Sequence, residues 1–427
     1  MKPLFHDRGK WLYGGLVAIT VLVCTLQVGW QYHESRWERA LRSSNDANGY
    51  YEFLPAALVK HDLDAMDYAF PVGNGRRLNV YPIGVALFEA PFFLAAHTQI
   101  LLEKGDATGW TSPYSKARLQ ATAFYCALGA LLVFLSLRRR FGDPLSAVAA
   151  LSVFAATNLL YYSAMEPGYS HAYSFFLFAA LLWLSHRTSD RPRGRWVAAM
   201  IVCGALILLV RPANAPVLLY PILAGTTSWR EVEQRLRDRF HERKAILAGL
   251  LIGLLCWAPQ LWYWHHVTGT WLPFTYGLKG EGFRWGEFHG ADVLFSHQNG
   301  WFIYSPFMLP VMVALIAMAW RRLEGARTIL LIWTFAWLTY SLWWCWWLGG
   351  SFGFRGFIEF GALLAVPMAW GIEQALRRSW SSVVLAIIVV LGVHINMVFT
   401  ELYDWPWEGE TWTWERVRHI YAVAFLE

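Results

Sequence analysis

Two acids in this sequence have the chemical context of a reaction site. Asp46 lies in a short polar segment, 43–50, and Glu166 stands directly before Pro167-Gly168. A carboxylate beside a reacting hydroxyl can take up its proton, which typically contributes about 10²–10⁴ in rate. The alternative for Asp46 is a helix N-cap, because Asp accepts hydrogen bonds from the free amides of a first turn. The alternative for Glu166 is a capped polar turn, and the local sequence leaves both alternatives open.

Two arginines have the context of an anion site. Arg355 lies in the glycine-rich segment 349–356, and Arg211 directly precedes Pro212. Glycines allow a backbone to approach a ligand closely, and a guanidinium matches phosphate oxygens with paired donors. These positions therefore predict phosphate binding. The alternative is that each side chain extends along apolar surface to reach lipid headgroups.

Two histidines are further candidates for contacts with a substrate. His171 follows Glu166 by five residues, and His297 lies in the polar segment 295–300. For His171 the competing interpretation is a structural hydrogen bonder. The five cysteines lie inside apolar segments with no spacing typical of a disulfide or a metal site, so they are interpreted as buried hydrophobic residues.

The elements that position these residues are predicted to be membrane helices. The 427-residue chain is 56% hydrophobic and only 15% charged, whereas soluble domains carry about 25% charged residues. Repeated apolar runs of roughly 16–24 residues match the length that spans a hydrocarbon core of about 30 Å. The composition therefore predicts an all-α, polytopic membrane protein. Its net charge of +6 lies in loops between apolar runs, without the basic, aromatic-rich stripe typical of nucleic-acid binding.

Basic residues predict which loops face which side. Short loops rich in Lys and Arg stay cytoplasmic, and an even number of apolar runs separates each basic cluster from the next. The clusters are Lys2/Arg8/Lys10, Arg138–Arg140, Arg187–Arg195, Arg230–Lys244, Arg321–Arg327 and Arg377/Arg378. The amino terminus is therefore predicted to be cytoplasmic and the carboxyl terminus to lie outside. All the candidate residues above then share the outer face.

We predict a single membrane domain, 1–427, with about eleven crossings. The crossings are 11–30, 118–137, 145–163, 171–186, 196–210, 213–228, 245–264, 301–320, 327–347, 356–376 and 380–398. The first outer loop, 31–117, is the longest and is predicted to hold interfacial helices at 47–60 and 81–100. Counting 81–100 as a crossing would place the five later basic clusters outside. The outer tail, 399–427, carries four tryptophans and is predicted to rest on the headgroups.

The chain resembles the GT-C superfamily of glycosyltransferases. The resemblance rests on this arrangement of crossings and on a local pattern in which Asp46 is followed by Tyr50 and then by Asp62. The segment from Tyr81 to Gly84 is also similar to the start of the second interfacial helix in many bacterial members. Relatives include the protein O-mannosyltransferases and the lipid A aminoarabinose transferase.

The resemblance implies an inverting glycosyltransferase of the bacterial inner membrane with a periplasmic active site. Its donor would be a sugar on a polyprenyl phosphate, and its acceptor a hydroxyl on a glycan, lipid or protein. Asp46 would be the general base, and Glu166 would orient the acceptor or help hold a divalent cation (Mg²⁺ or Mn²⁺) where one is used. Tyr50, Tyr81, His171 and His297 would contact the substrates.

Two departures from the family pattern concern the donor phosphate. Some relatives carry a basic residue three positions after the acid, where this chain has Gly49, and a Lys-Pro-Pro element is replaced by Val80-Tyr81-Pro82. Arg355, Arg211 and Lys60 are the residues expected to bind the phosphate instead. Arg76 or Arg77 could serve in place of Lys60, because nothing in the local sequence selects among the three.

A transporter or flippase of lipids or small molecules is the competing interpretation. Transporters usually place ionisable residues near the middle of the bilayer and often contain internal repeats. Here the polar candidates gather at one face and no repeat is evident, which favours the enzyme.

Overall fold

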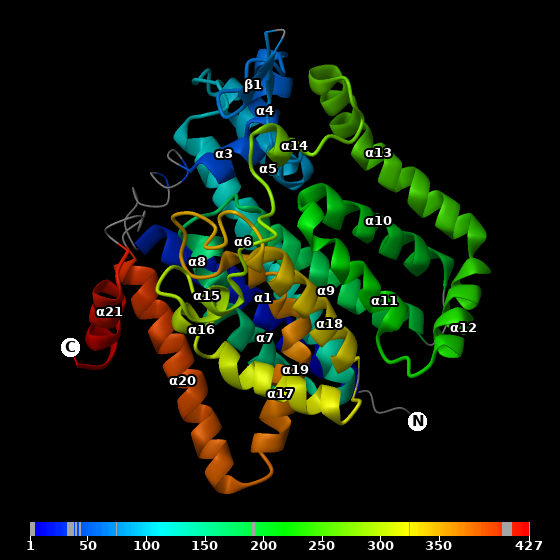
Figure 1. The fold of residues 1–427 in the computed structure, drawn as a ribbon, viewed down its shortest axis with the longest axis vertical. Helices are drawn as coiled ribbons and strands as arrows, with labels where there is room; N and C mark the ends of the chain where they lie inside the picture. The colour runs from blue at the N-terminus through cyan, green and yellow to red at the C-terminus, as the bar shows by residue number, and fades with distance from the viewer. Residues whose placement is uncertain are drawn as a thin grey trace.

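The computed structural model describes residues 5–31, 38, 41, 44–73, 75–189, 193–323, 325–403 and 412–426. This described part is largely helical, and its strands form a single two-stranded antiparallel hairpin (Figure 1). The predicted all-α class is confirmed.

The helices follow one another with few long irregular segments. The amino-terminal elements are α1 (Phe5–Gln31), α3 (Asn45–Tyr51), α4 (Phe53–Pro55), η1 (Ala56–Lys60), β1 (Phe70–Gly73), β2 (Arg76–Leu78) and α5 (Gly84–Leu102). The central elements are α6 (Ser112–Phe141), α7 (Asp143–Ala155), α8 (Leu159–Ala164), α9 (Ser170–Ser189), α10 (Gly194–Val210), η2 (Pro212–Leu219), α11 (Tyr220–Leu223), α12 (Trp229–Phe240) and α13 (Arg243–Thr268). The last elements are α14 (Thr275–Leu278), α15 (Gly290–Phe295), α16 (Trp301–Tyr304), α17 (Met308–Trp320), α18 (Ala326–Ser341), η3 (Arg355–Phe357), α19 (Gly361–Ala375), α20 (Ser379–Leu402) and α21 (Trp414–Leu426).

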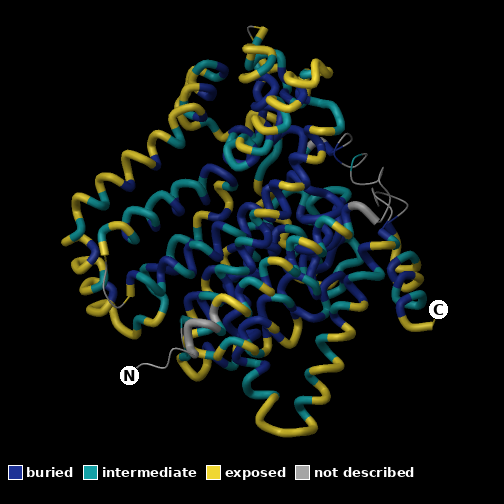
Figure 2. Tube along the Cα trace, turned by 180° about the vertical axis from the view of Figure 1, so that it is seen from behind, coloured by how far each residue is buried: buried dark blue, intermediate teal, exposed yellow. Residues whose placement is uncertain are grey.

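The core is the bundle of helices around α6, α9 and α19, whereas α13 and α20 are largely exposed. Figure 2 shows the contrast between the buried centre and these outer helices. Leu250 and Leu254 on α13 and Val383 and Ile387 on α20 are all more than 40% exposed. Large apolar side chains exposed along a whole helix are typical of a surface that faces lipid tails.

Five described helices, α1, α5, α6, α13 and α20, are long and apolar enough to cross a membrane. Three shorter helices, α7, α10 and α17, are also apolar. The expected crossings 145–163 and 301–320 are each broken in two, into α7 with α8 and α16 with α17. The count of eleven crossings therefore stays a prediction.

The expected crossing 213–228 differs from a regular helix. Its first part, η2, is a 3-10 helix of 8 residues, and α11 then ends at Leu223. With rises of about 2.0 Å and 1.5 Å per residue, the two parts span roughly 22 Å. Pro212 and Pro216 explain the irregularity, because proline cannot donate the backbone hydrogen bond of a helix interior.

Helix α5 stays beside the outer part of the bundle. Its ring contacts with α6 reach from Tyr114, which packs on Phe93, to Tyr125, which packs on Phe88. These two α6 residues are about 17 Å apart along α6, whereas α5 is about 28 Å long. The ring contacts with α5 therefore cover a stretch of α6 that is shorter than α5 itself. Its first residue, Gly84, packs on the backbone of Leu209 at the end of α10. This placement supports the proposal that α5 is interfacial.

The carboxyl-terminal segment turns back along α20. His394 of α20 lies 2.7 Å from the carbonyl of Ala424 in α21. Trp412 is buried and donates to the Tyr304 hydroxyl at 3.0 Å, whereas Trp414 is 42% exposed. Trp405 and Trp407 lie outside the described residues. Part of the tail thus packs against the bundle, in contrast to the expectation that it rests on the headgroups.

We predict that Glu103→Cys, after α5, reacts with a membrane-impermeant thiol reagent from outside, and that Arg378→Cys, between α19 and α20, does not. Both side chains are exposed. The measurement is labelling of intact cells in a background without the five native cysteines. The opposite pattern would mean that α5 crosses the membrane and that the later loops are inverted.

Candidate functional site

Asp46 lies in the first turn of α3, and Ser44 is the N-cap of that helix. The Ser44 hydroxyl accepts a hydrogen bond from the Ala47 amide at 3.1 Å. The N-cap interpretation of Asp46 is therefore wrong. Its side chain is 28% exposed, so the carboxylate is left for other contacts.

The Asp46 carboxylate is held by two partners from distant parts of the chain. Arg355 Nη1 lies 2.6 Å from Oδ2, and the Tyr81 hydroxyl donates to Oδ1 at 2.5 Å. Burial raises the pKa of Asp46, but the charge of Arg355 and the hydrogen bonds from Tyr81 and Arg355 together lower it below its usual range. Asp46 is therefore a carboxylate at neutral pH, as a general base requires.

Tyr81 is placed by close packing with α3. Its ring lies 4.8 Å from that of Tyr50 and 6.5 Å from that of Tyr276. Burial and then the neighbouring Asp46 charge raise the pKa of the Tyr81 hydroxyl well above its usual value. It therefore remains a proton donor to Asp46.

Arg355 reaches Asp46 from the predicted glycine-rich loop. Gly349 and Gly353 have φ values of 72° and 61°, which glycine adopts without strain. The guanidinium also donates to the Leu348 carbonyl at 2.9 Å and lies 5.2 Å from the centre of the Tyr169 ring. The loop therefore fixes one edge of the arginine while another edge holds Asp46.

Arg211 and His171 belong to a second polar network. Glu359 lies 3.0 Å from His171 Nδ1 and 3.7 Å from Arg211 Nε. Arg211 Nη1 lies 3.1 Å from the His171 ring, and Nη2 donates to the Tyr340 hydroxyl at 3.1 Å. Its charge is thus offset by a carboxylate that is itself completely buried.

Tyr50 lies between the two networks. Its hydroxyl bonds to Ser170, which in turn lies 3.4 Å from Arg211 Nη1. Its ring packs on Tyr81, the partner of Asp46. Six of the predicted site residues are thereby brought together: Asp46, Tyr50, Tyr81, His171, Arg211 and Arg355.

Glu166 is a buried acid close to Arg355. Its side chain is buried, accepts a hydrogen bond from the Tyr161 hydroxyl at 3.0 Å and is close enough to act electrostatically on Arg355. Gly168 has φ 86°, so the Pro-Gly turn is the tight turn that the sequence predicts. The buried position makes Glu166 an electrostatic partner of the arginine.

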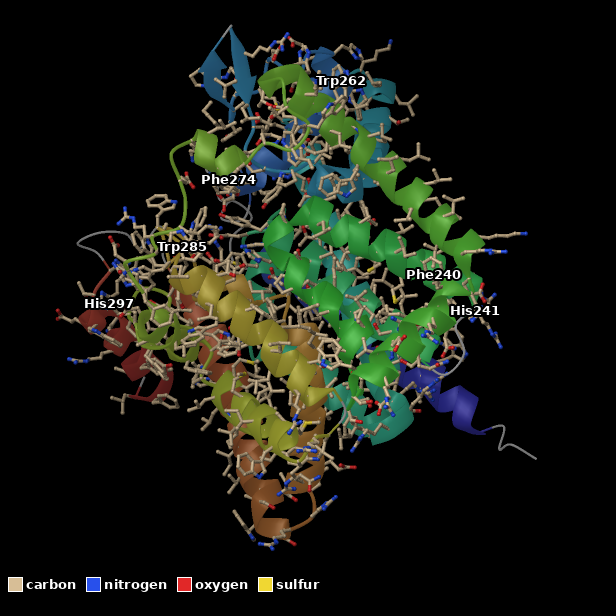
Figure 3. All side chains as sticks on the ribbon, turned by 45° about the vertical axis from the view of Figure 1, so that its right-hand side comes forward. Phe240, His241, Trp262, Phe274, Trp285 and His297 are labelled. Carbon is tan, nitrogen blue, oxygen red and sulfur yellow. The ribbon has the colours of Figure 1, made fainter. Side chains whose placement is uncertain are left out.

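Two predicted residues lie apart from these networks. Lys60 bonds to the Ala65 carbonyl and lies 3.9 Å from Asp67, within the same outer loop. The His297 ring packs 5.4 Å from that of Trp414 in α21, and Figure 3 shows His297 at the edge of the molecule beside that helix.

Arg118 forms hydrogen bonds to α3 and also lines a cavity. Its guanidinium, only 4% exposed, donates to the Ala47 carbonyl at 2.7 Å and to Asn48 Oδ1 at 3.0 Å. Glu89 lies 3.8 Å away and offsets its charge. Tyr51, Trp110 and Arg118 are among the lining residues of an adjacent cavity of about 470 Å³. Asn48, which also lines it, follows Asp46 by two residues, so the two side chains point about 160° apart around the helix.

Among the described residues, no group of three or more His, Cys, Asp or Glu side chains is arranged to hold a metal ion.

Solved structures with a similar architecture are membrane glycosyltransferases. Apo ArnT from Cupriavidus metallidurans superposes with a TM-score of 0.54 at 13% identity, covering 97% of this chain and 68% of ArnT. ArnT bound to undecaprenyl phosphate gives a TM-score of 0.51 at 13% identity, with coverages of 97% and 75%. The chain has the GT-C fold.

A third similar structure is the Archaeoglobus fulgidus oligosaccharyltransferase tethered with an acceptor peptide. It gives a TM-score of 0.51 at 10% identity over 92% of this chain, which spans only 55% of that protein. No protein-family model and no curated protein sequence matches the chain.

The structure explains one departure from the GT-C pattern. A Cβ at Gly49 would lie 2.2 Å from the ring of Tyr81. Tyr81 therefore occupies the space that a side chain at position 49 would need. Glycine at 49 is what allows the tyrosine to reach Asp46.

The sequence interpretation missed Glu359 and Arg118. Glu359 is an acid inside an apolar run, 356–376, and such residues usually have a partner or a function. Arg118 begins a predicted crossing at its outer end, against the positive-inside trend, as Arg355 does. The sequence contains both signals, an acid inside an apolar run and an arginine at the predicted outer end of a helix. Neither signal indicates which residue the side chain pairs with.

We predict that Gly49→Ala destabilises the protein by about 1–3 kcal/mol, the typical cost of overpacking. The added methyl would displace the Tyr81 ring, which Tyr50, Tyr276 and Asp46 hold in place. The measurement is thermal unfolding of the purified protein. Gly282→Ala is the control, because its Cβ would meet no atom within 4 Å. Equal unfolding midpoints for the two variants would contradict the packing argument.

Proposed function

We propose that this GT-C protein is an inverting glycosyltransferase that moves a sugar from a polyprenyl phosphate to a hydroxyl acceptor on the outer face of the membrane. The observation that carries the proposal is the contact of Asp46 with Arg355 and Tyr81. It supplies a base and a cation for a leaving phosphate in one place. The similarity to a structure with bound undecaprenyl phosphate supports this class of donor.

Asp46 is the general base of the proposed reaction. The acceptor oxygen attacks the anomeric carbon, the bond from that carbon to the phosphate oxygen breaks, and the acceptor proton passes to Asp46. The products are the glycosylated acceptor and the polyprenyl phosphate. Attack from the side opposite the phosphate inverts the anomeric centre in one step.

Arg355 is the principal cation for the phosphate. A fixed guanidinium beside the leaving group stabilises the charge that develops there. When the phosphate takes hydrogen bonds from Arg355, Asp46 loses part of its counter-charge and becomes a stronger base. Donor binding would thus prepare the carboxylate for proton transfer.

Arg211 lies beside the same site and can donate a hydrogen bond to the phosphate, although Glu359 offsets its charge and holds it in place. Tyr50 and His171 lie between these groups and are positioned to contact the sugar or the acceptor. The charge of Glu166 offsets part of the charge of Arg355. Lys60 and His297 lie outside the two networks, so we propose Arg355 as the principal residue that binds the phosphate.

Most of these residues lie in the predicted outer loops, and His171 and Glu359 lie near the outer ends of the predicted crossings 171–186 and 356–376. This arrangement favours a periplasmic site in a bacterial inner membrane. The α19–α20 turn lies at the lower end of the molecule in Figure 1, and α3 lies toward the upper left.

We predict that Asp46→Asn lowers turnover by at least about 10², the lower bound for loss of a general base. Asn keeps the size of the side chain and can still accept the hydrogen bond from Tyr81, but it takes up no proton at neutral pH. The measurement is sugar transfer by the reconstituted protein, with its unfolding midpoint recorded alongside.

Glu103→Gln is the control for Asp46→Asn. It removes a carboxylate from an exposed position in the same outer loop and should be close to silent. Parental transfer by Asp46→Asn would remove the base from the proposal and favour a transport role.

We predict that Arg355→Gln lowers kcat/KM for the donor by roughly 10- to 150-fold, because a charge-assisted hydrogen bond is worth about 1.5–3 kcal/mol. It should also move the acid limb of kcat/KM to higher pH. Transfer needs the Asp46 carboxylate and is lost as pH falls through its pKa, and Arg355 lowers that pKa.

Arg284→Gln is the matched control for Arg355→Gln. Arg284 is 54% exposed in an outer loop and pairs with Glu287 at 3.1 Å, and exposed pairs contribute little. An acid limb that stays in place in Arg355→Gln would show that the arginine does not control the base.

A further inference from the structure

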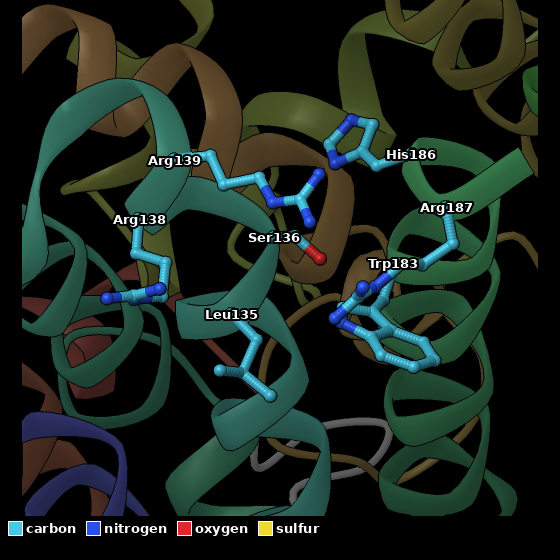
Figure 4. Close-up of a pocket in the computed structure, with 7 residues that line it drawn as sticks. All are labelled: Leu135, Ser136, Arg138, Arg139, Trp183, His186 and Arg187. Atoms are coloured by element: carbon cyan, nitrogen blue, oxygen red, sulfur yellow. The ribbon is translucent and has the colours of Figure 1, made fainter. Parts of the chain in front are cut away.

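A basic pocket lies at the other end of the bundle, between the last turns of α6 and α9. It has a volume of about 220 Å³ and is lined by Leu135, Ser136, Arg138, Arg139, Trp183, His186 and Arg187 (Figure 4). Along α6, Arg139 is 21 residues beyond Arg118, or about 32 Å at 1.5 Å per residue. The pocket is therefore separate from the site around Asp46.

The positive charges around this pocket are only partly offset. Arg138 donates to Asp143 at 2.9 Å and is neutralised by it. Within the described ranges, neither Arg139 nor Arg187 has a carboxylate within 4 Å. Burial and then the like charges of Arg139, Arg193 and Arg195 lower the pKa of Arg187. Among the described residues, the two arginines Arg139 and Arg187 thus line one hollow without a carboxylate within 4 Å.

The walls of the pocket hold these charges in place. The Arg187 guanidinium lies 4.9 Å from the centre of the Trp183 ring, and that ring packs 5.1 Å from Trp196. Trp is typical of the depth at which lipid headgroups lie. The volume equals roughly seven waters at about 30 Å³ each, which is enough for a phosphate group.

We propose that this pocket binds a phosphate group, on the membrane face opposite Asp46. Arg139 and Arg187 would donate paired hydrogen bonds to its oxygens, the geometry in which a guanidinium matches phosphate. The phosphate can belong to an anionic phospholipid headgroup or to a free anion. Basic pockets between membrane helices are typical sites for such headgroups.

The test compares binding to the purified full chain in detergent by two probes, phosphatidylglycerol and inorganic phosphate. Phosphatidylcholine and chloride at equal ionic strength are the references. The readouts are the unfolding midpoint and, by native mass spectrometry, the number of lipids retained. We expect phosphatidylglycerol to raise the midpoint, and Arg139→Gln/Arg187→Gln to weaken its binding at least tenfold and to retain one lipid fewer.

Arg377→Gln/Arg378→Gln is the matched control. It removes the same charge from exposed positions in the α19–α20 turn, at another predicted cytoplasmic loop, and should keep parental binding. An equal loss in the control, or an unchanged affinity in the pocket variant, would overturn the proposal. If inorganic phosphate gives the same arginine-dependent shift, the site takes free phosphate, and if only the lipid does, it takes a headgroup.

Arg139→Gln alone serves if the double variant does not fold. The Arg139 side chain is exposed, so its replacement should be tolerated. We expect this variant to bind phosphatidylglycerol more weakly than the parent, and parental affinity would overturn the proposal.

Discussion

The ion pair between Asp46 and Arg355 connects the first outer loop to a loop near the end of the chain. Both side chains are largely withdrawn from solvent, with exposures of 28% and 15%. Removing two charges from water is costly, and their attraction offsets that cost only when the geometry is good and further hydrogen bonds are made. Tyr81 and the Leu348 carbonyl provide those hydrogen bonds. The loops that carry Asp46, Arg355, Tyr81 and Leu348 must therefore keep these four groups at hydrogen-bonding distances.

The other buried polar contacts follow from the same constraint. An uncompensated charge in an apolar surrounding is strongly unfavourable, and the two further arginines beside the site, Arg211 and Arg118, each have an acid nearby. Glu359 lies beside Arg211, and Glu89 lies beside Arg118. Arg118 in turn fixes the backbone of α3, which carries Asp46. The helices thus position the base through charge pairs as well as through apolar packing.

The sequence predicted the parts of the fold that depend on local composition. The apolar runs gave the helices α1, α6, α13 and α20, and the two segments predicted to be interfacial, 47–60 and 81–100, are helical close to the expected bounds. The prediction was poorer where proline interrupts an apolar run. The first part of 213–228 is a 3-10 helix, because Pro212 and Pro216 cannot donate the backbone hydrogen bonds of a regular α-helix. The buried Trp412 shows a similar limit, since a tryptophan near a membrane surface can pack inward as well as outward.

The sequence by itself determined that this is a helical membrane protein, because apolar length is a local property, and its basic loops predict that the polar candidates share one face. It also identified Asp46, Tyr50, Tyr81, Arg211 and Arg355 as candidate site residues. Only the tertiary structure decided that Tyr81 and Arg355 hold Asp46, that Ser44 is the helix cap, and that Arg211 is balanced by Glu359. Apart from the local cap at Ser44, these pairings join residues that are far apart in the chain, so their distances are set by the packing of helices and not by the spacing of residues along the sequence.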